Sequence, residues 1–109
     1  SAEFIADFLD ELFQLESIES KKGLYHICAQ GETTWYELAD FILKTFVEIK
    51  GVPERALLPI HPIATSTLKT SATRPRNSRL CCNSLKKTFP FEYTHWKTQI
   101  TEIVKVLLK

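Results

Sequence analysis

The sequence has no methionine and only three glycines, which stand far apart. A dinucleotide-binding fingerprint and a phosphate-binding P-loop both need closely spaced glycines, so Gly23, Gly31 and Gly51 can form neither. Because the chain opens on Ser1 and contains no methionine, we expect a processed piece or an excised domain, not a complete translation product.

Cysteine is also scarce. Cys28 and the adjacent pair Cys81 and Cys82 make an odd number, which does not suit the disulfide framework of a small secreted domain. We therefore expect a reducing, cytoplasmic location. The adjacent pair could be redox-active, but nothing in the sequence activates either thiol, so small buried hydrophobic side chains are the preferred interpretation.

Neither sign of charge dominates, since 14 Lys and Arg face 13 Asp and Glu for a formal charge of +1. Without a large basic field we expect no nucleic-acid partner. Apolar runs are far shorter than the roughly 18 residues that cross a bilayer, and no secretion signal opens the chain, so we expect no membrane association. A length of 109 residues with 44% hydrophobic content fits one globular domain.

Apolar residues recur at helical spacing in three segments, which predicts helices over about 2–15, from Thr34 to Gly51, and near the C-terminus from Trp96 to Leu107. Thr34 and Glu37 have the spacing of a capping box, and Gly51 marks the end of that helix. Thr94 is the expected cap of the last helix. A short helix capped by Asn83 and Ser84 should run through Phe89.

The rest of the chain predicts little sheet. Leu24–Ala29 is short, apolar and aromatic enough for a buried strand, and residues 30–32 form a turn. Residues 52–78 are rich in proline, threonine and serine, as in surface loops that carry binding functions. Small extended pairs are expected near 58–63 and 78–80. The predicted fold class is α+β, helix-rich with few short strands.

One motif invites a catalytic interpretation, and the histidines are the residues to consider as metal ligands. Tyr93 and Lys97 have the Tyr-x-x-x-Lys spacing of short-chain reductases, in which the lysine lowers the tyrosine pKa. With Thr94 as a helix cap, however, Tyr93 precedes the helix and is better interpreted as a packing residue. No metal-ligand spacing accompanies the histidines, which are His26, His61 and His95.

The segment Arg74–Arg79 concentrates three guanidinium groups, an amide and a hydroxyl. The planar guanidinium fork suits bidentate pairing with phosphate or carboxylate, although a solvated basic loop is the plainer interpretation. Side chains alternate along an extended chain, so only some of them would touch one ligand. Trp35, at the start of a predicted helix, either stacks on a ligand ring or packs in the core, and core packing is preferred.

Three segments taken in order resemble one family, the dTDP-4-dehydrorhamnose reductases, which are extended short-chain dehydrogenase/reductases. The segments are 2–7, 23–37 and 72–80, and the last is similar to the family signature Arg-Pro-x-Asn-Ser-x-Leu. Trp96 at the start of the last helix also fits. The resemblance implies that residues 1–109 are a single C-terminal substrate-binding region, with the N-terminal NADPH-binding (or NADH-binding) Rossmann domain absent.

The resemblance also implies roles for individual residues. Arg74 is expected to contact the diphosphate of a dTDP-sugar, and Asn77 and Ser78 to fix the loop. Trp35 is a further candidate for the substrate site because of its position at the start of a capped helix. No catalytic or cofactor-binding residue is expected in this chain. Some relatives dimerise through carboxylate-bound magnesium; Glu3 matches one ligand, but a valine stands where the last helix would need an acid, so no metal is expected.

The parent enzyme, on this resemblance, reduces dTDP-4-dehydro-L-rhamnose to dTDP-L-rhamnose with NADPH. The alternative is a binding module without catalysis, similar to the regulatory subunit of methionine adenosyltransferase, although the stretch Gly31–Glu37 favours the reductases. A lone core strand would expose two unpaired edges, so we expect the isolated chain to self-associate, as a homodimer or by exchange of elements.

Overall fold

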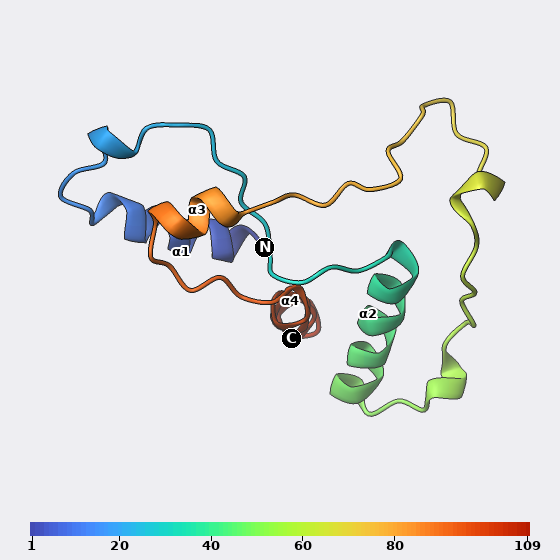
Figure 1. Cartoon of the computed structure of the whole chain (residues 1–109). Coiled ribbons are helices and arrows are strands. Elements are labelled where there is room, and N and C mark those ends of the chain that lie inside the picture. The colour runs from blue at the N-terminus through green and yellow to red at the C-terminus, as the bar shows by residue number, and fades with distance from the viewer. The chain divides into compact units, whose positions relative to one another are not determined.

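The computed structural model describes residues 1–109 and consists of helices joined by long irregular segments (Figure 1). The α-helices are α1 (Ala2–Phe13), α2 (Trp35–Lys50), α3 (Asn83–Thr88) and α4 (Trp96–Leu107). Three single turns of 3-10 helix lie between them, η1 (Glu19–Lys21), η2 (Glu54–Ala56) and η3 (Thr65–Thr67). The chain forms two compact units: unit 1 contains residues 1–31 and 79–99, and unit 2 contains residues 32–78 and 100–109.

Backbone pairing between strands is almost absent. A single parallel bridge joins Gln30 to His95 in unit 1. The Gln30 amide donates to the Thr94 carbonyl at 2.9 Å, and the Trp96 amide donates to the Gln30 carbonyl at 3.0 Å. The molecule is therefore helix-rich, as predicted, but the strand content of the predicted α+β class is reduced to one bridge.

The predicted buried strand Leu24–Ala29 is wrong. The segment forms no strand, and the Leu24 side chain is 86% exposed. A strand exists only where a neighbouring backbone supplies the ladder of hydrogen bonds, and no second strand lies beside this segment. The extended pairs predicted near 58–63 and 78–80 do not form either. Within 58–63, Pro59 and Pro62 lack the backbone N–H that a ladder needs.

Unit 1 is held by a small aromatic core between α1 and the segment that follows α3. The Phe8 ring meets Phe89 edge-on at 6.0 Å between centroids and Phe91 at 5.3 Å. Edge-to-face pairs of this kind contribute about 0.5–1.5 kcal/mol beyond the area they bury. Leu85 of α3 is the most deeply buried apolar side chain, at 2% exposure, and Phe4 of α1 is also buried.

The termini of α2 follow the sequence closely. The Glu37 amide donates to Thr34 Oγ1 at 3.2 Å while Glu37 Oε2 accepts from the Thr34 amide at 2.9 Å, so the predicted capping box is confirmed. Gly51 ends the helix in the left-handed conformation, with φ of 63°. Only glycine reaches this conformation without a steric cost, which explains why the helix ends there.

The other helices begin and end close to the predicted positions, with two corrected caps. Ser1 caps α1, which ends at Phe13, two residues before the predicted end. The helix α3 begins at Asn83, so the cap position falls on Cys82, whose side chain makes no capping hydrogen bond. His95, not Thr94, caps α4, because the Lys97 amide donates to His95 Nδ1 at 3.2 Å.

Candidate functional site

The arginine-rich segment lies on the surface in an irregular part of the chain. Arg74, Asn77 and Ser78 are all exposed and belong to unit 2, whereas Arg79 belongs to unit 1. After α2 the loop runs back along the helix and passes the end at which α2 begins (Figure 1).

Trp35 is the first residue of α2 and belongs to unit 2. Its side chain is 84% exposed, so the preferred interpretation as a core residue is wrong in this structure. The cause is local: the capping box fixes the start of the helix one residue earlier, and the indole extends from the first turn into solvent. An exposed indole offers an apolar ring face on which a flat ligand group can stack.

Tyr93 does not share a helix with Lys97, which lies in the first turn of α4. Tyr93 precedes α4, as predicted, and its ring packs against Phe91 at 5.5 Å between centroids. Its hydroxyl donates to the Phe89 carbonyl at 3.2 Å. Burial raises the pKa of Tyr93, whereas a catalytic phenol of this kind needs a lowered pKa. The geometry supports the packing role.

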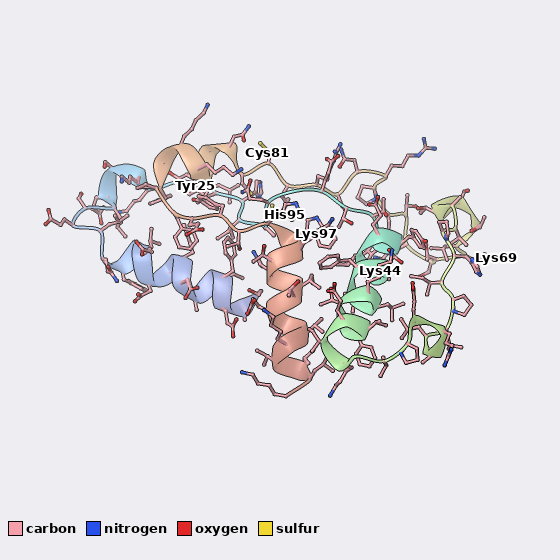
Figure 2. All side chains as sticks on the ribbon, turned by 90° about the horizontal axis from the view of Figure 1, so that it is seen from below. Tyr25, Lys44, Lys69, Cys81, His95 and Lys97 are labelled. Carbon is pink, nitrogen blue, oxygen red and sulfur yellow. The ribbon has the colours of Figure 1, made fainter.

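The cysteines of unit 1 lie closer together than their spacing in the sequence indicates. Cys82 is buried, as preferred, but Cys81 is exposed, and Figure 2 shows it at the start of α3. Cys28 Sγ lies 3.2 Å from Cys82 Sγ. This contact was missed because 54 residues separate the two cysteines and no local pattern reports a long-range approach.

A cavity of about 470 Å³ opens in unit 1 and was not predicted. Its lining is mostly apolar, with two lysine side chains, and consists of Phe8, Leu12, Ile18, Lys21, Lys22, Gly23, Tyr25, Ile27, Leu85 and Phe89. The Tyr25 hydroxyl donates to the Lys21 carbonyl at 2.6 Å. The lining has no carboxylate, thiol or imidazole, and its ionisable side chains are Lys21, Lys22 and Tyr25.

No three His, Cys, Asp or Glu side chains lie close enough together to hold a metal ion. None of the helices has both the length and the apolar character that crossing a bilayer requires. The chemistry that the structure does present is an exposed cationic loop, an exposed indole and a pair of neighbouring thiols.

Comparison with known proteins identifies the family. The model of the RmlD substrate binding domain matches residues 1–109. The chain belongs to the RmlD substrate binding domain family. Relatives named dTDP-4-dehydrorhamnose reductase include one from Sinorhizobium fredii, 31% identical over 80% of this chain, and one from Burkholderia thailandensis, 35% identical over 79%. A third, from Escherichia coli, is 32% identical over 78%.

This RmlD-type chain spans less than a third of the length of these relatives. The matched regions cover 28%, 29% and 28% of the three reductases. A fourth reductase, from Shigella flexneri, is 27% identical over 97% of the chain and 35% of the relative. No solved structure matches the chain. The family supports the resemblance noted from the three sequence segments, and substrate binding is the role that its name describes.

Proposed function

We propose that this chain is the C-terminal substrate-binding portion of a dTDP-4-dehydrorhamnose reductase of the extended short-chain dehydrogenase/reductase class. The whole protein, on this proposal, acts in the cytoplasm and reduces dTDP-4-dehydro-L-rhamnose to dTDP-L-rhamnose with NADPH. The family and the names of the relatives support it. They also favour a reductase over a regulatory module similar to the methionine adenosyltransferase subunit.

Within that enzyme, unit 2 would supply contacts to the dTDP-sugar. The observation that carries this role is that Trp35 and the segment with Arg74 belong to the same compact unit and are both exposed. An Arg74 guanidinium can pair with two diphosphate oxygens, and the Trp35 indole can stack on a ring of the ligand. Asn77 and Ser78 would fix the loop that presents Arg74.

NADPH would bind elsewhere in the parent, because the residues of this chain do not fit a dinucleotide site. Two of its three glycines adopt positive φ, and each already has a structural task. Gly31 makes room for the His95 ring, and Gly51 ends α2. Neither opens a helix with its amides free for phosphate, as the dinucleotide fingerprint requires.

The proposed dTDP-sugar site is tested by titrating the 109-residue chain with dTDP and with dTDP-rhamnose, followed by backbone amide chemical shifts. We expect saturable shifts at residues 74–78 and at Trp35. Charge-assisted hydrogen bonds contribute about 1.5–3 kcal/mol, so Arg74→Ala should weaken binding about tenfold to a hundredfold.

Arg55→Ala is the matched control, since it removes an exposed arginine from η2 in the same unit. It should leave the affinity unchanged. Equal losses of affinity in Arg74→Ala and Arg55→Ala would show that Arg74 acts only through the net charge of the chain. An absence of shifts at millimolar ligand would contradict the claim that this chain holds contacts to the sugar nucleotide by itself.

We also propose that the isolated chain self-associates, as a homodimer. Large apolar side chains are widely exposed, including Phe13 at 82% and Leu58 at 86%. Burying such surface is favourable by about 25 cal/mol per Å². Sedimentation at increasing concentration should show a rising mean mass, and a monomer at every concentration would contradict the proposal.

A further inference from the structure

Cys28 and Cys82 are arranged for a reaction that neither the family nor the proposed dTDP-sugar site requires. Their sulfur atoms lie 3.2 Å apart as free thiols, in hydrogen-bonding contact. A disulfide bond is about 2.05 Å long, so the two atoms need to approach by only about 1.2 Å to bond. Both cysteines belong to unit 1, so the contact lies within one compact unit.

The two thiols differ in access to solvent. Cys82 is buried immediately before α3, whereas Cys28 is half-buried in the irregular segment that follows Gly23. The Cys28 thiol also lies 3.9 Å from the Leu80 carbonyl. A small oxidant therefore reaches Cys28 first, and the buried Cys82 is the thiol that reacts second.

We propose that Cys28 and Cys82 form a redox-sensitive pair that hydroperoxides convert into an intramolecular disulfide. The Cys28 thiolate attacks one peroxide oxygen, the O–O bond breaks, and Cys28 becomes a sulfenic acid. The Cys82 sulfur then attacks the Cys28 sulfur; the S–O bond breaks, the S–S bond forms and water leaves. In total, two thiols lose two electrons and two protons, and one hydrogen peroxide becomes two waters.

The surroundings of Cys28 set the conditions under which the pair reacts. Burial, followed by the hydrogen bond with Cys82, raises the pKa of Cys28 to about 11, against a smaller opposite effect of the Lys86 ammonium. Because the thiolate is the nucleophile, the reaction is slow near neutral pH. Its rate should rise about tenfold for each pH unit until the pH reaches about 11.

The disulfide would join the two chain segments from which unit 1 is built. It would close a loop that starts at Cys28, contains Trp35 and Arg74, and ends at Cys82. Both ends of the stretch that carries the proposed sugar-nucleotide contacts would then be covalently tied. Oxidation of unit 1 would thereby restrict the chain that enters and leaves unit 2 at residues 31–32 and 78–79.

The test uses the full 109-residue chain, treated with hydrogen peroxide, blocked with N-ethylmaleimide and digested with trypsin without reduction. Cleavage after Lys22, Lys44, Arg79 and Lys86 gives the peptides 23–44, with Cys28, and 80–86, with Cys81 and Cys82. We expect these two peptides to be cross-linked. Fragmentation of the cross-linked species should place the bond on Cys82.

Cys81→Ser is the matched control, because Cys81 is exposed and its replacement leaves the core intact. The cross-link should persist in Cys81→Ser and disappear in Cys28→Ser and in Cys82→Ser. A bond between Cys81 and Cys82, or a cross-link that Cys81→Ser abolishes, would overturn the proposal. So would the absence of any disulfide at the highest pH at which the chain stays folded.

A mixture of ¹⁵N-labelled and unlabelled chains separates bonds within one chain from bonds between chains. A disulfide within one chain yields cross-linked peptides that are wholly labelled or wholly unlabelled. Mixed pairs at the random proportion would show that the bond joins two copies and would refute the intramolecular pair. Circular dichroism of each cysteine variant checks that a lost cross-link does not reflect a lost fold, and Cys81→Ser alone decides the outcome if the other two fail to fold.

Discussion

Two leucines of unit 1 allow the small core to be tested with the same chemical change. Leu85 of α3 is 2% exposed, whereas Leu24 is 86% exposed although its sequence pattern predicts a buried strand. Leu85→Ala and Leu24→Ala remove the same atoms. The difference between their effects therefore reports the environment of each side chain and not the intrinsic change of residue.

The expected magnitudes follow from burial. Replacing a fully buried leucine by alanine costs about 2–5 kcal/mol, because transfer free energy is lost and a cavity remains. Leu85 lines the cavity together with Phe89 and is almost fully buried, so we expect Leu85→Ala to lower the free energy of unfolding by an amount in that range. A leucine already in water loses little, so Leu24→Ala should change the free energy of unfolding by less than about 0.5 kcal/mol.

Urea denaturation followed by far-ultraviolet circular dichroism measures both variants against the unmodified chain. With unchanged m-values, the shift in midpoint gives the change in stability directly. In thermal unfolding, 1 kcal/mol corresponds to about 4–8 °C for a unit of this size, so Leu85→Ala should lower the Tm by at least about 8 °C. A cost above about 1.5 kcal/mol for Leu24→Ala would refute the exposed location of this segment.

Three further predictions concern caps, glycines and pH. Thr34→Ala removes one half of the capping box and should lower the stability of α2 by about 1 kcal/mol. Faster amide hydrogen exchange in the first turn of α2 would measure this loss. Gly51→Ala should lower the free energy of unfolding by about 1–2 kcal/mol in thermal unfolding, because the φ of Gly51 is 63°. Gly31→Ala should lower it more, since the added Cβ would lie within 2.8 Å of the His95 ring. Equal losses of stability in the two variants would contradict that contact. Folding raises the pKa of Cys28 from 9.0 to about 11, so the folded state favours the protonated thiol. The stabilisation from this thiol is complete below about pH 9 and is lost as the pH rises to about 11. The stability difference between the unmodified chain and Cys28→Ser should shrink over that interval, and a constant difference would contradict the shift.

The features that local sequence determines were predicted well. The capping box at Thr34 and the left-handed Gly51 each depend on a few neighbouring residues, and the structure has both. Helical periodicity placed α1, α2 and α4 within a few residues of their observed ends. Local hydrogen bonds and the absence of a Cβ act without help from the rest of the fold, so a sequence reports them reliably.

The features that depend on distant partners were predicted poorly. Leu24–Ala29 has the composition of a strand, but a ladder needs a second backbone beside it. His95 replaces Thr94 as the cap of α4 because the bridge from His95 to Gln30 fixes where the helix can begin. The roles of Arg74, Asn77, Ser78 and Trp35 in binding a sugar nucleotide stay predictions, because a ligand contact depends on an arrangement that no local pattern encodes.

Each of the two compact units is built from two separate stretches of the chain, and this limits how either unit can be isolated. The backbone passes from one unit to the other three times, at residues 31–32, 78–79 and 99–100, and the last passage falls within α4. Neither unit is a continuous stretch of sequence, so neither can be obtained by truncation. A protease that cuts the exposed loop between η2 and η3 would leave two fragments, each of which carries part of both units. Reassembly of those fragments after mixing would measure directly how strongly each unit holds its own segments together without a covalent link.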